Sequence, residues 1–410
     1  MRITLTTLLS LFLVTAFGQK KDYNIILDNA KVLFKSTRDL NSEELKQFDY
    51  YPIVTLLEKA VQLNPKSAEA RYFLGYAYSR LNLKDGRRMT TMNLDLLYKS
   101  SEQFEKVIQL DPKYSGEIIV LDPYSKLSAE WGSMALSYWY NNKMDSALWA
   151  FKTGKKRGGF SNFILQLNKK VLDACSKNAI LIASGDNSSF PLWYLQLVEN
   201  YRTDVSIIDI NLLNSPWYPA FLVQNKSVAF DLPNNVLDTI EYTKWKNKMI
   251  TIKDFSWEVK PSYYDQYLLR GDRIFLSLLK ENKFRRNLYF TTGFPEESRL
   301  NLKDFLSSYI VVDKLSIPQE ESIGFEAYKQ LISNYLILSR HLNLNSPDEM
   351  RLFDDLRYDL LDRVNDYLSR DEKEKAKALM QLLDKFAGED KYPYSDESAK
   401  KYVNSLKERI

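Results

Sequence analysis

Cysteine and histidine are almost absent from this sequence of 410 residues, which contains one of each. The lone Cys175 excludes an intrachain disulfide and a zinc site built from cysteines, and we expect it to be buried in a helix. His341 lies in an apolar helical stretch with no G-x-S-x-G segment, so a nucleophile activated by histidine is not expected. H-E-x-x-H, P-loop and G-x-G-x-x-G motifs are missing too, and we therefore expect no metal and no cofactor.

A strong charge bias is also missing. The 57 basic and 53 acidic residues leave a formal net charge of +4, and the basic residues are spread along the chain. Nucleic acid is therefore not an expected partner. Aromatic residues are abundant, with 27 Tyr, 21 Phe and 7 Trp, which suits either bulky helix packing or stacking on sugars and peptides.

The chain begins with a short apolar stretch, residues 3–17, which follows Arg2 and has small residues at Ala16 and Gly18. This pattern is typical of a secretory signal peptide, here residues 1–18, and the stretch is shorter than the roughly 20 residues of a membrane-spanning helix. No other stretch is long and apolar enough to span a membrane. We therefore expect an exported protein, periplasmic or associated with the cell envelope, with no membrane span after signal cleavage.

Residues 19–160 have helical spacing throughout, and two near-identical joints, VQLNPKSAEA and VIQLDPKYSG, recur in them. In each joint a proline ends one helix before the next begins. Large and small residues follow the spacing of a tetratricopeptide repeat at Trp131, Met134, Ala135, Tyr138, Ala147, Phe151 and Gly154. The resemblance to that family predicts about three repeats, which either bind a protein partner in a groove or only support the next domain.

The segment NAILIASGDNSSFPLWY, residues 178–194, predicts a strand, a polar loop and a helix. Ser188 or Ser189 would be the N-cap of this helix and Pro191 its first residue. A second strand at 205–210 follows after one helix, so the two strands should be parallel, with a right-handed connection.

More strands are expected at 288–292 and 309–313, each after a helical stretch, 273–281 and 302–307. Residues 161–320 are therefore predicted to form a mostly parallel α/β sheet covered on both faces by helices. Residues 321–410 are helical again. The expected fold class is α/β plus all-α: an N-terminal tetratricopeptide solenoid, a central α/β domain with the Gly-Asp-Asn loop, and a C-terminal helical region.

Polar residues end both of the first two strands, at the edge where parallel sheets usually bind ligands. Asp186 and Asp209 are candidate catalytic residues that would act as an acid/base pair or, with the neighbouring asparagines, hold a hard cation. Alternatively, Asp186 and Asn187 shape the loop and cap the helix through side-chain to backbone bonds. The aromatic residues here either line a sugar-stacking cleft or pack the sheet. The candidate binding residues are Asp186, Asn187, Trp193, Tyr194, Asn211, Asn214, Trp217 and Tyr218.

The segment GDNSSFPLWYLQLVENYRTDVSIIDINLLNSPWY resembles a bacterial family of protein O-mannosyltransferase-like membrane proteins, with Ser188 at a position where the family has aspartate. The first matching pattern comprises Gly185, Asp186, Asn187, Phe190, Pro191, Leu192, Trp193, Tyr194, Gln196, Val198, Glu199, Arg202, Asp204 and Val205; the second comprises Asn211, Leu212, Leu213, Asn214, Trp217 and Tyr218. Glycosyl transfer in the family belongs to a multi-spanning membrane part. The resemblance therefore implies an extracytoplasmic accessory domain rather than a transferase.

These features favour an exported, non-catalytic binding or scaffold protein, whose repeats engage a protein partner and whose α/β domain engages a glycan or protein ligand. Two alternatives remain at this point. One is a carboxylate-dependent enzyme or accessory factor that acts on envelope glycans or glycoproteins through Asp186 and Asp209. The other is a structural subunit of a larger envelope assembly.

Overall fold

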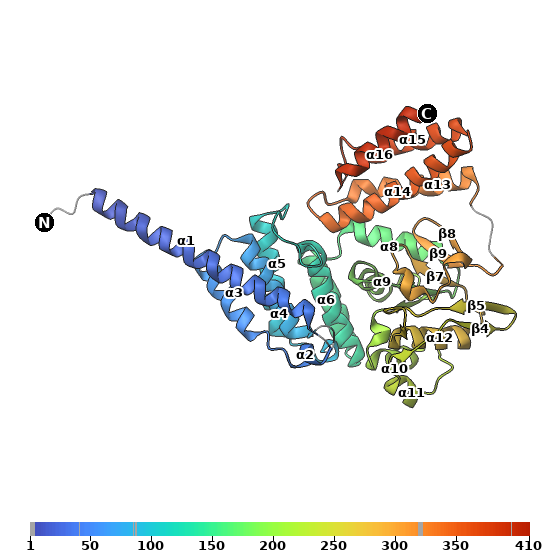
Figure 1. Cartoon of the computed structure of the whole chain (residues 1–410), viewed down its shortest axis with the longest axis horizontal. Coiled ribbons are helices and arrows are strands. Elements are labelled where there is room, and N and C mark those ends of the chain that lie inside the picture. Colours follow the sequence, from blue (N-terminus) through green and yellow to red (C-terminus); the bar gives the residue numbers. More distant parts are fainter. Residues whose placement is uncertain (1–4, 41, 85, 87, 319–322, 395) are drawn as a thin grey trace. The chain divides into compact units, whose positions relative to one another are not determined.

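The structure is a computed structural model that describes residues 5–40, 42–84, 86, 88–318, 323–394 and 396–410. The chain divides into two compact units, Met1–Gly159 and Phe160–Ile410 (Figure 1). Residues 1–4 of the predicted signal peptide lie outside the described residues, and residues 5–18 form the start of a helix. Within the described ranges, no helix is both long and apolar enough to cross a membrane.

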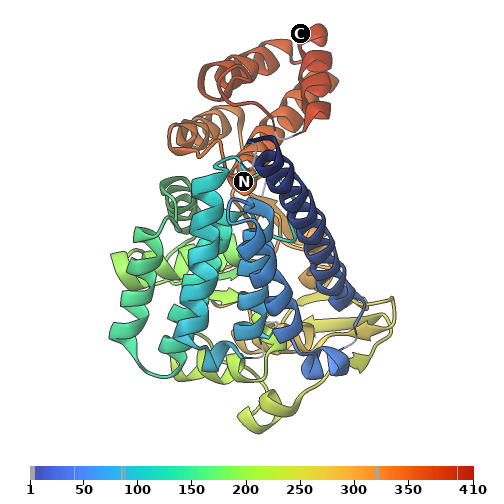
Figure 2. The same ribbon diagram turned by 90° about the vertical axis from the view of Figure 1, so that its left-hand side faces the viewer.

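The first unit is built from helices, most of which pack against the next or next-but-one helix along the chain (Figure 2). They are α1 (Leu5–Ser36), α2 (Ser42–Gln47), α3 (Tyr51–Leu63), α4 (Ala68–Leu83), α5 (Leu94–Leu110), α6 (Pro123–Tyr140) and α7 (Met144–Lys156). The prediction of a helical N-terminal region is therefore confirmed. Two helical hairpins, α4–α5 and α6–α7, make the most extensive contacts in this unit.

Buried tyrosines of α4 hold the segment between α5 and α6. The hydroxyl of Tyr72 accepts a hydrogen bond from the Ile119 N–H and donates one to the Leu121 carbonyl, at 2.9 and 2.7 Å. The hydroxyl of Tyr76 accepts from the Leu121 N–H at 2.8 Å. These bonds satisfy backbone groups that no helix or strand satisfies, which is why polar rings are kept in an otherwise apolar core.

The second unit contains a five-stranded sheet with helices around it and a layer of helices after it. Its helices are α8 (Asn162–Ala174), α9 (Asp186–Glu199), α10 (Trp217–Gln224), α11 (Asn234–Thr239), α12 (Arg270–Asn282), α13 (Phe325–Leu336), α14 (Pro347–Ser369), α15 (Lys373–Ala387) and α16 (Glu397–Arg409). Its strands are β1 (Ile180–Ala183), β2 (Ser206–Asp209), β3 (Thr243–Lys244), β4 (Lys248–Ile252), β5 (Phe255–Val259), β6 (Tyr267–Leu268), β7 (Leu288–Thr291), β8 (Leu306–Ser308) and β9 (Val312–Leu315).

The order of strands in the large sheet is β2-β1-β7-β9-β8. The strand β1 is parallel to both β2 and β7, which confirms the predicted parallel pair. The connection from β1 to β2 crosses the sheet in one direction, and the connection from β2 to β7 crosses it in the opposite direction, past β1. Right-handed connections therefore place α9 and α12 on opposite faces. Both faces are covered, because every residue of β1 and of β7 is buried.

The expectation of a mostly parallel sheet is wrong at one edge, where β9 is antiparallel to β7 and to β8, so the sheet as a whole is mixed. The predicted helix at 302–307 is wrong as well. Residues 303–305 form one short 3-10 turn, and the chain then runs directly into β8. Only three residues separate β8 from β9, which permits a hairpin but is far too short for the crossover that parallel strands require.

The C-terminal helices α13 to α16 pack on one another and form the orange and red layer in Figure 1. The prediction that the C-terminal region is helical is therefore confirmed. Phe163 of α8 meets Phe353 of α14 edge-on, with ring centroids 6.1 Å apart. This aromatic contact joins the layer to the helix that precedes β1, so α8 lies between the sheet and α14.

Candidate functional site

The loops after β1 and β2 lie side by side at one edge of the sheet. Ala183, the last residue of β1, is level with Asp209, the last residue of β2. The side-chain amide of Asn211 donates a hydrogen bond to the Ser184 hydroxyl across the two loops at 3.3 Å. The structure thus brings together the two polar segments that the sequence predicts to meet.

The helix after β1 begins earlier than predicted. Gly185 is the N-cap residue, with a φ of +88° that side chains rarely adopt, and α9 begins at Asp186. The N–H groups of Ser188 and Ser189 donate to the Gly185 carbonyl. The expected serine N-cap is therefore wrong, and Pro191 lies inside the helix instead of at its start.

This internal proline explains an interaction between α8 and α9. Pro191 has no N–H, so the carbonyl of Asn187, four residues earlier, loses its helical donor. The side-chain amide of Asn168 on α8 donates to that carbonyl at 3.2 Å and to the Ile164 carbonyl at 2.9 Å. Asn168 is almost fully buried, so this bond fixes the first turn of α9 against α8.

Asp209 is buried and its oxygens are already used. It accepts hydrogen bonds from the N–H groups of Asn211 and Leu212, at 2.8 and 3.0 Å, and from the hydroxyl of Ser189. Burial and, to a smaller degree, the nearby charge of Asp186 together raise the pKa of Asp209 to about 6, although its hydrogen bonds lower it. The carboxylate therefore shapes the turn after β2, and it is 5% exposed.

The other predicted site residues are mainly part of the framework. Asn214 accepts a hydrogen bond from the N–H of Gly271 at 2.8 Å and so caps the first turn of α12. Gly271 lies so close that a Cβ there would approach Asn214 Nδ2 to 2.9 Å. The N–H of Asp209 donates to the hydroxyl of Tyr218, which is fully buried.

Large aromatic residues of the matched segment, by which we mean the residues 185–218 that carry the resemblance described above, also pack inward. Trp193 and Tyr194 are 3% and 5% exposed. Tyr194 stacks on Phe160, with centroids 5.2 Å apart, and the half-buried Trp217 meets Tyr218 edge-on at 5.4 Å. Trp193, Tyr194 and Tyr218 therefore belong to the core of this unit, and the structure does not gather them around an open cleft.

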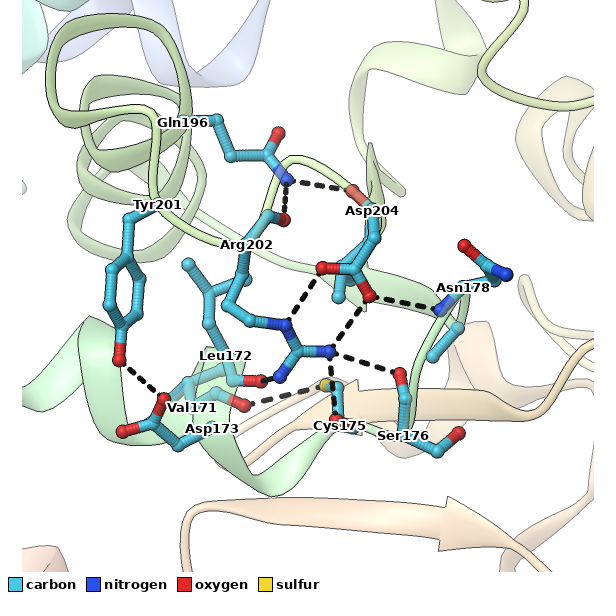
Figure 3. Close-up of polar contacts among 12 residues, drawn as sticks. Val171, Leu172, Asp173, Cys175, Ser176, Asn178, Gln196, Tyr201, Arg202 and Asp204 are labelled. Carbon is cyan, nitrogen blue, oxygen red and sulfur yellow. Dashed lines mark hydrogen bonds and ion pairs between the residues drawn. The ribbon is translucent and has the colours of Figure 1, made fainter.

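Arg202 forms the most extensive polar cluster of the matched segment, shown in Figure 3. Its guanidinium makes a two-bond ion pair with Asp204, at 2.8 and 3.0 Å. It also donates to three backbone carbonyls at the end of α8, those of Leu172, Cys175 and Ser176. A cation is favoured at this position because the last carbonyls of a helix carry partial negative charge.

Neighbours of Arg202 complete this clamp, which we define as Gln196, Arg202 and Asp204. Asp204 accepts a hydrogen bond from the N–H of Asn178 just before β1, and the Arg202 guanidinium lowers the pKa of Asp204 well below its usual range. Gln196 donates to the carbonyls of Arg202 and Val205. The clamp thus ties the end of α8 to the beginnings of β1 and β2.

Cys175 lies at the end of α8, where its thiol donates to the Val171 carbonyl at 3.4 Å. The predicted burial of this residue is confirmed, and burial raises the pKa of the thiol to about 12. His341 ends a 3-10 segment, Ile337–His341, and its Nε2 accepts from the side chain of Arg340 at 3.1 Å. Among the residues that the structure describes, no group of three or more His, Cys, Asp and Glu side chains is placed to hold a metal ion.

A cavity of about 350 Å³ opens beside the Gly-Asp-Asn loop. Its walls come from α8, the first turn of α9, the end of β7, the turn between β8 and β9, and one face of α14. Asp186 and Asp209 are not among its lining residues. The polar lining residues are Asn168, Asn187, Ser188, Thr291, Thr292, Ser308, Asp355, Tyr358, Asp359 and Asp362.

Two features of this cavity were not expected from the sequence. Three aspartates of α14, at positions 355, 359 and 362, share the face toward the cavity. Burial raises the pKa of Asp355 and of Asp359, and Asp359 also accepts a hydrogen bond from the Tyr328 hydroxyl at 2.7 Å. The spacing D-x3-D-x2-D was the available signal, since such residues lie on one side of a helix.

Comparison with known proteins gives one family match. The family model of TMEM260-associated domain 2 matches residues 165–259, which run from α8 to β5. This family is linked to O-mannosyltransferase-like membrane proteins, which confirms that part of the resemblance. None of the curated proteins compared with the chain matches it.

The clamp generates a prediction about stability. Replacing Arg202 with Ala should lower the free energy of unfolding by about 3 kcal/mol, because it removes the charge-assisted bonds to Asp204 and to three backbone carbonyls. Replacing Arg202 with Lys should recover only part of the lost stability, because lysine lacks the planar guanidinium group that bonds several acceptors at once. Urea denaturation measures both, with Arg285→Ala at an exposed ion pair as the control. A loss of stability no larger than that of Arg285→Ala would show that the clamp does not stabilise this unit.

Asp209 generates a prediction about pH. Its pKa of about 6 lies above the value near 4 of an unfolded aspartate, so the folded protein binds the proton more tightly. Its contribution to stability therefore falls as the pH rises between those values, by about 1.4 kcal/mol per pH unit. Asp209→Asn should remove this dependence. Its free energy of unfolding, relative to that of the unchanged protein, should rise by about 2–3 kcal/mol from pH 4 to 7.

Chemical denaturation across that pH range makes the comparison. Asp366→Asn is the matched control, because Asp366 forms a solvent-accessible ion pair with Arg370. It should leave the pH dependence of stability intact. Parallel pH profiles for Asp209→Asn and the unchanged protein would show that Asp209 titrates normally.

Proposed function

We propose that this protein is an exported, non-catalytic binding protein of the cell envelope. Its α/β unit holds a small polar ligand, a glycan, in the cavity between α9 and α14, and its helical repeats engage a protein partner. The observation that carries the proposal is the cavity itself, at the carboxyl end of β7, with hydroxyl, amide and carboxylate groups on its walls. Ligands commonly bind at this edge of an α/β sheet.

A glycan suits the lining of this cavity. Sugars present many hydroxyl groups in fixed directions, and the cavity presents many donors and acceptors on separate secondary-structure elements. Its volume of about 350 Å³ lies within the range of small-molecule sites. The link of the matched family to O-mannosyltransferase-like membrane proteins supports a sugar-related role.

Binding is favoured over turnover by the state of Asp209. A general acid or base must reach the substrate proton, but Asp209 is buried and already accepts three hydrogen bonds. Asp186, the first residue of α9, acts electrostatically on Asp209 and is not itself a lining residue of the cavity. The acid/base version of the site therefore has less support than a binding site.

The first unit supports the protein-partner part of the proposal. Its α4–α5 and α6–α7 hairpins are the helix pairs that would form the proposed repeats, in which a small residue lets paired helices approach. Gly75 shows that closeness, since a Cβ there would come within 2.9 Å of the Phe104 ring. A groove of about 600 Å³ also lies along α5, α6 and α7. Its lining includes Trp149, which is 40% exposed, and Arg157, which pairs with Glu105 at 2.5 Å.

The cavity proposal is tested by adding envelope glycans to the full chain. We expect saturable binding in calorimetry that Ser188→Trp, which adds a bulky side chain to the cavity lining, reduces by at least about tenfold, roughly 1.4 kcal/mol. Asp186→Asn should bind as the unchanged protein does. Mass spectrometry of the same mixtures checks turnover, and a product that forms only with Asp186 intact would establish the enzyme in place of the binding protein.

The groove of the first unit is tested by cross-linking the full chain in envelope extracts. Trp149→Ala should reduce recovery of a specific partner about fivefold or more, because exposed tryptophans contribute strongly to protein interfaces. Val120→Ala, at an exposed apolar side chain of the same unit, is the control and should recover the partner normally. Equal recovery with both variants would rule out the groove.

A further inference from the structure

The acidic wall of the cavity has a geometry that selects among ligands. Asp355, Asp359 and Asp362 are separated by four and three residues, so they lie along one stripe of α14. The stripe extends about 10 Å along the helix axis at 1.5 Å per residue. Asp355 and Asp362 keep accessible surface and Asp359 is half-buried, so all three carboxylates border the cavity.

No lysine or arginine lines this cavity, in so far as the structure describes its surroundings. Two arginines of α14 lie outside the lining, although the charge of Arg351 acts on Asp355 and that of Arg363 acts on Asp359. Arg351 pairs with Asp348 at 3.6 Å, and Arg363 stacks over the ring of Tyr328 at 4.8 Å. Clustered carboxylates with no cation in the cavity repel one another and resist burial. A positively charged ligand would reduce both the repulsion between the carboxylates and the cost of burying them.

Opposite the acidic stripe is a buried hydroxyl without a partner. Thr291, at the end of β7, lines the cavity and is 3% exposed. Its Oγ1 has no hydrogen-bond partner among the described residues. A buried hydroxyl left in this state costs about 1–3 kcal/mol. This second observation, independent of the aspartates, indicates a polar ligand group in the cavity.

The same geometry excludes two other ligand classes. An anionic sugar or phosphate would face three carboxylates and no lining cation. A divalent cation needs oxygens that converge to within about 2.0–2.6 Å of one point, whereas these aspartates are spread along two turns of helix. No metal-holding cluster occurs among the described side chains either.

We propose that the cavity binds the protonated primary amine of a small polar ligand, as carried by an amino sugar. The ammonium group pairs with the aspartate stripe of α14, and a hydroxyl of the ligand bonds to Thr291 Oγ1. This inference rests on the proposed function and names the chemistry of its ligand. The same ammonium group occurs on a lysine side chain, so both sources are tested.

Calorimetric titration of the full chain near neutral pH compares D-glucosamine, N-acetyl-D-glucosamine and D-glucose, which differ only at C2. D-glucosamine should bind at least about tenfold more tightly than the other two, as expected for a charge-assisted bond. A lysine derivative blocked at its backbone amine and carboxyl forms the second arm. Tighter binding of the lysine derivative would assign the amine to a peptide, and tighter binding of glucosamine would assign it to a glycan.

Two variants locate the binding. Asp355→Asn removes one charge from the stripe and should weaken glucosamine binding about fivefold or more. Thr291→Val should weaken it too, yet leave the free protein as stable or more stable, because it removes an unpartnered buried hydroxyl. Asp366→Asn, further along α14 and outside the cavity lining, is the control and should bind normally.

The outcomes separate the two proposals. Equal binding of glucose and glucosamine would overturn the amine inference and leave a neutral-sugar site, so that the proposed function would stand. Binding of envelope glycans without binding of glucosamine or of the lysine derivative would also overturn the amine inference and leave the proposed function standing. Amine binding that Asp355→Asn and Thr291→Val leave unchanged would also overturn the inference, since the ammonium would then lie elsewhere.

Discussion

The ion pair between Arg202 and Asp204 is the interaction on which the α/β unit most depends. It closes the end of α8 and fixes that helix to the beginnings of β1 and β2. Because α8 is fixed there, Asn168 can donate to the Asn187 carbonyl that Pro191 leaves without a helical donor. The same helix packs against α14 through an aromatic pair. One cluster of charge-assisted bonds thus positions three walls of the cavity: α8, the first turn of α9 and the acidic face of α14.

The matched segment has its clearest role in this framework. Gln196, Arg202 and Asp204 make the clamp, and Asp209 and Asn214 shape the turns that follow β2. Residues that look like a binding signature in sequence can therefore be the ones that hold two strands and two helices in register. In the proposed site, the groups that would face the ligand come from the same loop and from α14, far along the chain. A family signature of this kind identifies the scaffold, and the surrounding elements decide what it binds.

Much of the fold could be predicted because apolar runs and helical spacing directly reflect burial. The parallel pair β1–β2 follows from one such run and one crossover helix. The start of α9 could not be placed, since the positive φ of Gly185 depends on how the loop meets its neighbours. The hairpin β4–β5 was missed although KMITI and FSWEV alternate with period two. The aspartates of α14 look like an ordinary solvated face until tertiary contact sets them opposite Thr291.

The central claim is that the cavity between α9 and α14 is a ligand site for a sugar bearing a protonated amine. A crystal structure of the full chain grown with D-glucosamine tests it most directly. The account predicts the sugar in this cavity, with its amine within hydrogen-bonding distance of the Asp355 or Asp359 carboxylate and a hydroxyl on Thr291 Oγ1. A cavity that contains only ordered water bridging Thr291 to the aspartates, at a sugar concentration that saturates binding, would contradict it.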